Sequence, residues 1–325
     1  LGEVIDATIA TIDNPAISID DLIELMPGPD FPTGGIILGR LGIKSAFHTG
    51  RGSVVLRGRV HTEELRKDRE ALVVTEIPYQ VNKALMIERI AEMVRDKKIE
   101  GISDIRDESS RQGMRVVIEI KRDAMADVVL NQLYRFSQLQ STFSVNNIAL
   151  TGGRPEQLNL KDLLQAFISF REDVVTRRTK FLLNKSRDRA HILVGLAIAV
   201  ANIDDVIKLI RRSKDASEAR EALMGRAWPA KDLGPLIALI ADPRHSLGAD
   251  NNYRLSDEQA RAILDLRLQR LTALGIDEIT DELQKLAKEI SEYLDILRSR
   301  LRVMNIIKIA EADTVTPFVI LRCVG

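Results

Sequence analysis

The sequence is poor in the residue types that build metal, redox and nucleophilic sites. It contains a single cysteine, Cys323, and four histidines in 325 residues. One cysteine excludes a disulfide within the chain and is typical of a reducing compartment, so we expect a cytoplasmic protein. His48, His61, His191 and His245 are scattered without the spacing of zinc ligands. We therefore expect no metal site.

Long apolar runs are scarce as well. The stretch LVGLAIAVANI at residues 193–203 is shorter than the roughly 20 residues that cross a bilayer. The first residues do not combine a basic segment with an apolar one, so the sequence predicts no signal peptide and no membrane partner. Because the chain begins with Leu1 instead of methionine, we expect a fragment of a longer polypeptide.

Motifs for nucleotide binding and hydrolysis are missing. Residues 49–60, TGRGSVVLRGRV, place glycines around Arg51, but a P-loop needs a Gly-Lys-Ser/Thr ending that opens a helix. The sequence also has no dinucleotide fingerprint and no nucleophile elbow. We therefore expect no self-contained active site and no cofactor bound to this chain.

The charges are balanced overall but unevenly distributed. Lys and Arg together equal Asp and Glu, at 47 each. Residues 1–30 carry seven acids and no Lys or Arg, residues 40–60 carry five bases and no acid, and residues 171–189 carry seven bases against three acids. Local basic faces on a neutral chain are compatible with phosphate binding, because salt screens charges beyond about 10 Å. A solvated surface explains the same charges equally well.

Hydrophobic patterns predict an α+β domain over residues 1–158. Two short helices are expected at 3–13 and 18–26, with Ser18 as the N-cap of the second. A turn-rich connector follows at 27–35. Beyond it the sequence predicts four β-branched strands, GIILGR, SVVLRGRV, ALVVTEI and MRVVIEI, and two helices at 82–99 and 123–137.

The second half has the spacing of long helices. Apolar residues recur every three or four positions over 159–212, which predicts one helix about 80 Å long. A heptad pattern over 276–308 predicts a second helix that runs back along the first, and residues 213–275 lie between them. We therefore predict a multi-domain fold, in which the α+β domain is followed by a long antiparallel coiled coil with a small all-α globular knob.

Three stretches are candidates for binding. The first is TGRGSVVLRGRV, where glycines allow close approach of a ligand and Arg51, Arg57 and Arg59 supply phosphate contacts. Alternation along one strand puts the side chains of Arg57 and Arg59 on one face. The second is EIPYQVNKA at 76–84, where Lys83 follows Asn82 at a predicted helix start; a structural cap explains it as well as an anion site.

The third candidate is QARAILDLRLQRLT at residues 259–272. Its apolar residues are too many for one buried helical stripe, so the excess either packs inside the knob or forms an exposed dimer patch. Arg267 and Arg270 would lie at the rim of such a patch. The expected interface residues are Ile263, Leu266, Arg267, Leu268 and Leu271.

Seven stretches together resemble one protein family. In chain order they are GPDFPTGG, TGRGSVVLRGR, EIPYQVNKA, RDESSRQGMRVVIEIKRDA, NLKDLLQAFISFREDVVTRRTKF, RAHILVGLAIAVANIDDVIKLIR and QARAILDLRLQRLT. They are similar to the A subunits of DNA gyrase, and less closely to those of topoisomerase IV. The resemblance covers the chain from about residue 3 to about residue 308.

The resemblance implies a type IIA topoisomerase breakage-reunion subunit. Residues 1–158 would be its tower domain, 159–212 and 276–308 its coiled-coil arm, and 213–275 its C-terminal dimerisation gate. Two such subunits would act with two ATP-hydrolysing B subunits to break a duplex, pass a second one and reseal the first, which introduces negative supercoils. The residues expected to hold the gate DNA are Lys44, Arg51, Arg57, Arg59 and Lys83.

The resemblance also implies what this chain does not carry. The family nucleophile is a tyrosine that follows an arginine in a winged-helix domain. None of Tyr79, Tyr134, Tyr253 and Tyr293 lies in that context, so we expect no DNA cleavage by this chain alone. ATP and Mg²⁺ are expected on the B subunit. Residues 309–325 depart from the family pattern, and Thr316-Pro317 is expected to end the returning helix.

Overall fold

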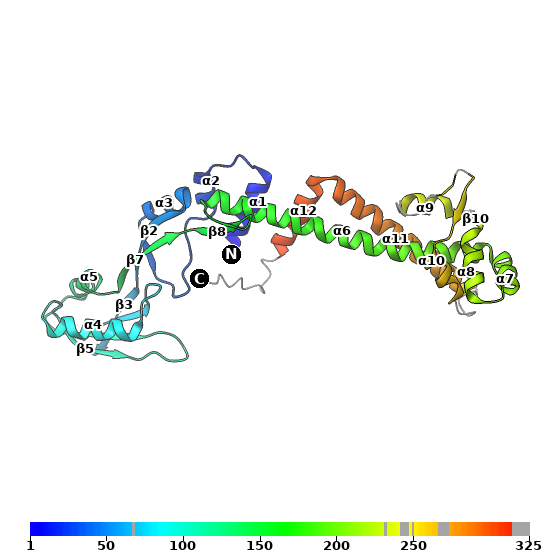
Figure 1. Ribbon diagram of the computed structural model, residues 1–325. Helices are drawn as coiled ribbons and strands as arrows, with labels where there is room; N and C mark the ends of the chain where they lie inside the picture. The colour runs from blue at the N-terminus through cyan, green and yellow to red at the C-terminus, as the bar shows by residue number, and fades with distance from the viewer. Residues whose placement is uncertain (67–68, 231–232, 241–246, 249, 266–272, 314–325) are drawn as a thin grey trace. The chain divides into compact units, whose positions relative to one another are not determined.

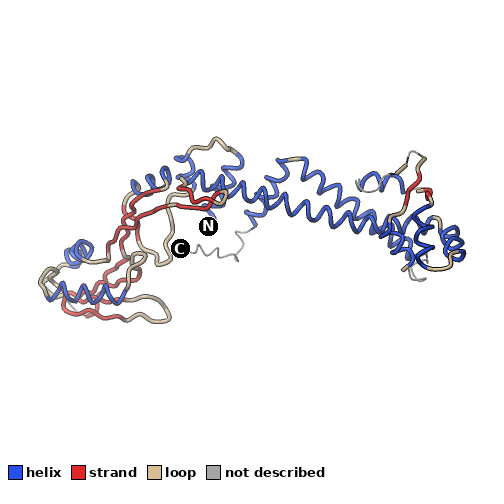
Figure 2. The backbone as a smooth tube through the Cα atoms, in the orientation of Figure 1, coloured by secondary structure: helices blue, strands red, loops and turns tan. Residues whose placement is uncertain are grey.

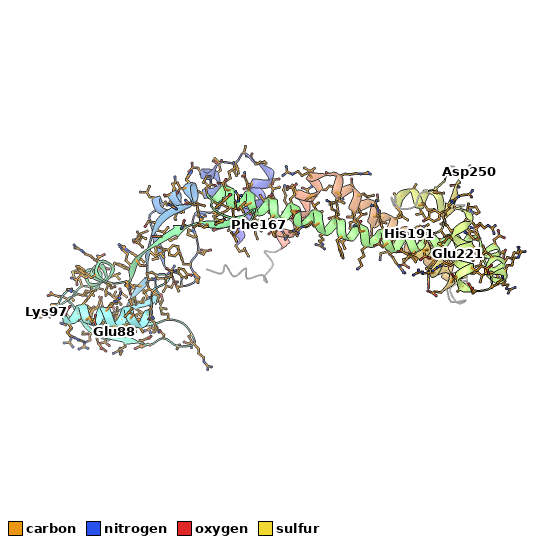
Figure 3. The ribbon with its side chains drawn as sticks, in the orientation of Figure 1. Glu88, Lys97, Phe167, His191, Glu221 and Asp250 are labelled. Carbon is orange, nitrogen blue, oxygen red and sulfur yellow. The ribbon has the colours of Figure 1, made fainter. Side chains whose placement is uncertain are left out.

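The computed structural model describes residues 1–66, 69–230, 233–240, 247–248, 250–265 and 273–313 (Figures 1 and 2). The chain divides into two compact units, residues 1–168 and 169–325. The described residues form twelve helices and several small antiparallel sheets, so the fold is mixed α and β. Figure 3 draws their side chains, with Glu88 on the helix of residues 83–95 and His191 on the longest helix. No described helix combines the length and the apolar character needed to span a bilayer.

The described part of the first unit holds five complete helices. Four of them match the predicted segments, and Ser18 is confirmed as an N-cap because the Asp21 backbone N–H donates to its Oγ at 3.1 Å. The helix at residues 41–49 was not predicted, because its nine residues are short and hold Gly42 near the start. The helices are α1 (Gly2–Asp13), α2 (Ile19–Leu25), α3 (Leu41–Thr49), α4 (Lys83–Arg95) and α5 (Ala126–Phe136).

The described strands of this unit form two sheets and a hairpin, all antiparallel. The three-stranded sheet has the order β1 (Ile36–Leu38), β2 (Arg51–Arg57), β7 (Gln140–Asn146). The four-stranded sheet has the order β3 (Arg59–Arg66), β4 (Arg69–Glu76), β6 (Val116–Ile120), β5 (Ile102–Asp107). The hairpin joins β8 (Ile148–Thr151) to β9 (Arg154–Gln157). The prediction that SVVLRGRV forms a single strand is therefore wrong, because Gly58 divides this stretch between two sheets.

The two larger apolar clusters of the first unit stabilise it. One lies between the four-stranded sheet and helices α4 and α5, and includes Leu72, Ile90, Ile118 and Leu133. The other joins α1, α2, α3 and β2 to the first turns of α6 (Leu160–Ala201), through residues such as Leu22, Phe47, Leu56 and Leu164. Both clusters bury residues from segments far apart in the chain, which is how a unit of this size offsets its conformational entropy.

Helix α6 has 42 residues and enters the second unit at Ser169. It is continuous through the polar positions between Arg177 and Asp188, but it ends at Ala201, and α7 (Ile203–Arg212) follows. The prediction of one helix to residue 212 is thus wrong beyond 201. Asn202 separates the two helices with φ −121°, and its Nδ2 donates to the carbonyl oxygens of Ile198 and Pro229 at 2.9 and 3.1 Å.

The returning segment consists of two helices, α11 (Ala273–Arg298) and α12 (Arg300–Asp313), separated at Ser299. Three ion pairs connect it to α6: Arg189 with Glu282 at 2.8 Å, Glu172 with Arg300 at 2.8 Å and Arg171 with Glu311 at 3.0 Å. In these three pairs the residue number on α6 decreases as the residue number on α11 and α12 increases, so the helices run antiparallel. Helix α12 extends to residue 313, into the segment predicted to depart from the family pattern. Thr316 and Pro317 lie outside the described residues.

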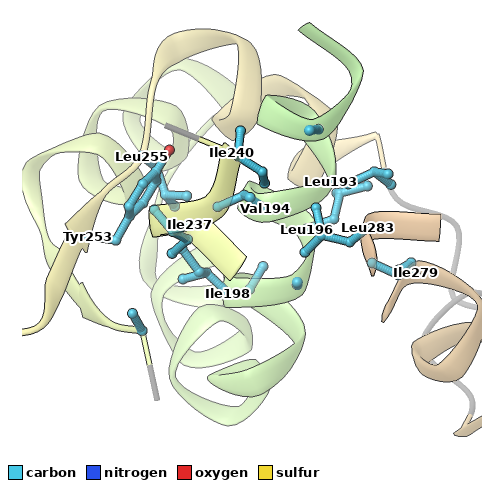
Figure 4. Packing of buried hydrophobic residues seen from close by; sticks show 14 of the residues in the cluster. Leu193, Val194, Leu196, Ile198, Ile237, Ile240, Tyr253, Leu255, Ile279 and Leu283 are labelled. Carbon is cyan, nitrogen blue, oxygen red and sulfur yellow. The ribbon is translucent and has the colours of Figure 1, made fainter. Parts of the chain in front are cut away.

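The region between these helices is not all-α, which corrects the prediction. Beside α8 (Ala216–Gly225), α9 (Gly234–Ile240) and α10 (Asp257–Leu264) it contains β10 (Ala227–Pro229) and β11 (Asn252–Arg254), which pair antiparallel. The register sets Trp228 opposite Tyr253, and both are buried. The indole Nε1 of Trp228 donates to the Leu223 carbonyl at 2.9 Å. Figure 4 shows Tyr253 in the same cluster as Leu193, Ile237 and Leu283.

Candidate nucleic-acid interface

The glycines of TGRGS allow α3 to pack directly on β2. Gly50 ends α3 in the left-handed region with φ 76°, and a Cβ there would lie 2.6 Å from the Leu158 carbonyl oxygen. A Cβ on Gly42 would overlap the Ser53 carbonyl, and one on Gly52 would overlap the Gly42 carbonyl. The packing of the chain's own backbone therefore explains why glycine is needed at these positions, and the approach of a ligand to this backbone stays a prediction.

Arg51 lies on the surface at the start of β2. Its carbonyl oxygen accepts hydrogen bonds from Ser45 Oγ and Thr49 Oγ1, both at 2.9 Å, so the backbone that carries it is well defined. Its side chain is exposed and has no carboxylate partner in the described part of the chain. The guanidinium can therefore bind an anion without first breaking an ion pair. Phosphate is the anion that suits its planar fork.

Lys44 is another exposed cation of this region, on α3. Its Nζ lies 4.0 Å from Asp20 Oδ1 on α2, and His48 Nε2 lies 3.3 Å from the same oxygen. The Lys44 and Asp20 side chains are 53% and 65% exposed, so solvent screens their attraction. Replacing the Asp20 carboxylate by a phosphate as the partner of Lys44 would therefore cost little free energy.

Arg57 is half-buried and has partners within its unit. Its Nε donates to Gln140 Oε1 at 2.6 Å, and its guanidinium carbon lies 4.5 Å from the centroid of the Tyr134 ring. Burial raises the pKa of Tyr134 above its ordinary value, against the opposing effect of the Arg57 charge. The neutral phenol then donates to the Gly58 carbonyl at 3.1 Å. Arg57 thus has a packing role whether or not it also contacts DNA.

Arg59 belongs to the other sheet and is more exposed. Its side chain is 60% exposed, and its Nε lies 3.3 Å from Glu76 Oε2. The Gly35 backbone N–H donates to the same carboxylate oxygen at 2.6 Å. Glu76 therefore connects the turn before β1 with β3, and its carboxylate contacts the Nε atom of Arg59. The remaining N–H groups of Arg59 stay available to a ligand.

Lys83 forms a shorter ion pair than Lys44 or Arg59. Its Nζ lies 2.7 Å from Asp107 Oδ2 on β5, and this contact, together with Ser109, lowers the pKa of Asp107 to about 2. Asn82 is confirmed as the N-cap of α4, since its Oδ1 accepts from the Leu85 N–H at 3.2 Å. The structural interpretation of this stretch therefore accounts for the contacts of Lys83. A DNA contact by Lys83 stays a prediction.

The expected dimer residues are only partly within the described chain. Ile263 is buried among the apolar residues of the second unit, which favours internal packing for this side chain. Leu266, Arg267, Leu268 and Leu271 lie outside the described residues. Among the residues that the structure describes, no three His, Cys, Asp or Glu side chains are grouped to hold a metal ion.

Sequence reasoning missed the residues that position the arginines. Gln140 and Tyr134 are far along the chain from Arg57, and Glu76 lies on the strand after Arg59, so nothing in the local pattern singles them out. The aromatic residues Phe31, Tyr79 and Phe143 were missed for the same reason. Their rings lie 5.2 to 5.8 Å apart and pack against the cluster beneath β2.

Comparisons with known proteins agree along nearly the whole chain. The family model for the A subunits of DNA gyrase and topoisomerase IV matches residues 1–310. The DNA gyrase A subunit of Granulibacter bethesdensis is 60% identical over 306 residues, which is 94% of this chain and 33% of that protein. The Pseudomonas aeruginosa gyrase protein is 48% identical over 319 residues, 95% of this chain and 34% of that protein.

A third relative, the DNA gyrase A subunit of Salmonella typhimurium, is 52% identical over 295 residues, which is 87% of this chain and 33% of that protein. The chain therefore spans about a third of the length of the curated relatives it matches. The resemblance drawn from the seven sequence stretches is confirmed. Because the family model matches 310 consecutive positions, the chain belongs to the family of DNA gyrase and topoisomerase IV A subunits.

Proposed function

We propose that this chain is part of the A subunit of a DNA gyrase. In the complete enzyme it would support ATP-dependent negative supercoiling by breakage, passage and religation of duplex DNA. The relatives named above are all gyrase A subunits, which favours gyrase over topoisomerase IV. We further propose an assembly of two A with two B subunits in the cytoplasm, with ATP and Mg²⁺ bound by the B subunit.

The first unit would be the tower domain that holds the flanks of the gate DNA. The observation that carries this role is the exposed guanidinium of Arg51, which has no carboxylate partner in the described chain. Lys44 and Arg59 are also largely exposed. Contacts of this kind position a duplex by its phosphates and carry no sequence information.

The second unit would form the arm and the exit gate. The three ion pairs between α6 and the returning helices support an antiparallel coiled coil. The region between α7 and α11 would be the dimerisation knob, with Leu266, Arg267, Leu268 and Leu271 at a two-fold interface. Such an interface must open to release DNA, so it is expected to be modest in area.

The chain is proposed not to cleave DNA by itself. Each of its tyrosines is already engaged: Tyr79 packs on Phe31 and Phe143, Tyr134 lies beneath Arg57, and Tyr253 accepts a hydrogen bond from Gln259. Tyr293 packs against the apolar cluster of the second unit. A nucleophilic side chain is activated by an adjacent base, a lowered pKa or a bound metal, whereas burial raises the pKa of Tyr134.

A structural homodimer without DNA contact is the alternative. The observation in its favour is that Arg57, Arg59 and Lys83 each have a partner within the chain. Binding of a fluorescent DNA duplex to the whole chain, measured across a series of salt concentrations, separates the two functions. Phosphate contacts predict affinity that falls linearly on a log–log plot, and removal of one contact should reduce the slope by about 1. Affinity too weak to detect at low salt would favour the structural alternative.

A further inference from the structure

Helix α6 carries a regular row of side chains along one face. We name it the outer stripe: Phe170, Val174, Arg178, Phe181 and Lys185. Successive members are three or four residues apart, so they share one face of the helix. Phe170 is 60% exposed and Phe181 is 67% exposed. Two phenylalanine rings are thus presented to solvent on one ridge.

The opposite face of α6 is already occupied. Thr179, Leu183, Ser186 and Ala190 are buried there. Their positions are about half a helical turn away from the outer stripe. The pairing of α6 with α11 and α12 therefore does not account for the stripe.

The charges of the same segment divide into engaged and available groups. Arg171 and Arg189 pair with Glu311 and Glu282, Arg177 pairs with Asp173 at 3.0 Å, and Arg187 Nε donates to the Ile240 carbonyl at 3.3 Å. The remaining bases, Arg178, Lys180 and Lys185, are exposed and have no carboxylate partner within the described chain. Two of them, Arg178 and Lys185, flank Phe181 on the stripe.

Apolar residues at this spacing with cations beside them are the pattern by which one helix packs on another. The spacing is that of coiled-coil contact positions, and flanking charges select the partner. A phosphate backbone would use Arg178 and Lys185 but would leave both phenylalanine rings in water. An acidic protein helix would cover the rings and neutralise the cations.

We propose that the outer stripe docks an acidic amphipathic helix of a partner protein. From Phe170 to Lys185 the stripe is about 22 Å long, which matches a partner helix of about four turns. The partner would place leucine-type side chains against Phe170 and Phe181, and Asp or Glu opposite Arg178 and Lys185. This interaction does not depend on the DNA contacts proposed for the first unit.

The test uses the whole chain and two synthetic helical peptides labelled with a fluorophore. Both peptides have leucine at heptad positions a and d. At positions e and g, one peptide has glutamate and the other has lysine. Fluorescence anisotropy should show binding of the glutamate peptide, weakened about tenfold or more by Phe181→Ala, as expected of a central aromatic contact. The paired reversal Arg178→Glu with Lys185→Glu should abolish that binding and create binding of the lysine peptide.

Two controls keep the test specific. Lys180→Glu changes the same charge off the stripe, and Leu301→Ala removes a side chain that is 72% exposed on α12; both should leave glutamate-peptide binding within about twofold. Circular dichroism checks that each variant keeps its helix content. The proposal is overturned if the glutamate peptide does not bind, or binds equally well after Phe181→Ala or the charge reversal. It is also overturned if the reversal removes duplex DNA binding instead, which would make the stripe a nucleic-acid surface.

Discussion

Arg57 and Arg59 are two positions apart in the chain and lie in different β-sheets. Arg57 ends β2 and pairs with Gln140 on β7, whereas Arg59 begins β3 and pairs with Glu76 on β4. Gly58 is the residue where the chain crosses from one sheet to the other, and its N–H donates to the Leu139 carbonyl at 2.8 Å. The relative placement of the two guanidinium groups therefore depends on this junction, together with the Glu76 contacts to Gly35 and Arg59.

Gly58→Ala should destabilise the first unit. The added Cβ would lie 2.7 Å from both the Glu76 carbonyl oxygen and Leu139 Cδ1, so backbone and side chain must shift. We expect a loss of about 1–3 kcal/mol in the free energy of unfolding, measured with urea. Gly2→Ala is the matched control, since nothing lies within 4 Å of its Cβ. Equal stability of the two variants would contradict a tight junction.

Arg51 and Arg57 should respond differently to alanine. Arg51→Ala removes an exposed guanidinium, so duplex affinity should fall and the salt slope should decrease by about 1, while stability is unchanged. Arg57→Ala also removes the hydrogen bond to Gln140 and the contact with Tyr134, which should lower stability by about 1–2 kcal/mol. Duplex binding and urea unfolding measure the two effects separately. Loss of stability in Arg51→Ala would contradict its description as a surface group.

The double variant Arg57→Ala with Arg59→Ala should weaken duplex binding by the intact enzyme and flatten its salt dependence further. The double substitution removes both positive charges from the proposed DNA-binding surface, although the two residues belong to different sheets. Duplex affinity at a series of salt concentrations is the measurement, with Lys98→Ala as a control at an exposed position that pairs with Asp96. Unchanged binding would remove both arginines from the DNA contact surface.

Lowering the pH should reduce the stability that Glu63 gives to the four-stranded sheet. Arg115 and His61 hold the pKa of Glu63 at about 2 instead of 4.5 in the folded chain. A carboxylate with a lowered pKa contributes stability that is complete above its unfolded pKa and disappears as pH falls through its folded pKa. The urea midpoint should therefore fall as pH is lowered from about 4.5 to about 2.

Glu63→Gln tests the origin of this pH dependence. The amide cannot titrate, so the variant should begin less stable at neutral pH and lose less stability on acidification. Glu64→Gln is the neighbouring control, because Glu64 is exposed and has no ion pair among the described residues. Identical acid profiles for the wild type and Glu63→Gln would show that other carboxylates dominate.

Leu266→Glu should convert a dimer of the chain to monomer if the knob self-associates through this residue. A carboxylate in an apolar two-fold interface is brought close to its own symmetry copy and loses its hydration. Sedimentation velocity measures the change. Ile263→Ala provides the contrast, because Ile263 is buried within the unit and its truncation should cost about 2–5 kcal/mol of stability instead. A dimer that survives Leu266→Glu would count against the interface.

Residues close in sequence explain why several elements could be predicted. Ser18 and Asn82 cap helices through backbone groups three residues away. The apolar spacing of α4, α5 and α6 repeats within each turn, so it is visible in short windows. Of the candidate interface, the exposed cations Lys44 and Arg51 were identified from sequence. The residues that hold Arg57 and Arg59 were not.

Local sequence was enough to specify the capped starts of α2 and α4, the long helix up to residue 201 and the family. These depend on caps, helical periods and extended motifs that can be recognised along the chain. Contacts in the folded chain were needed to divide SVVLRGRV between two sheets and to pair Trp228 with Tyr253 in a β-ribbon. They also determine which cations are already engaged. Such features join residues tens of positions apart, as Arg57 joins Gln140, and no local pattern encodes which distant segments will meet.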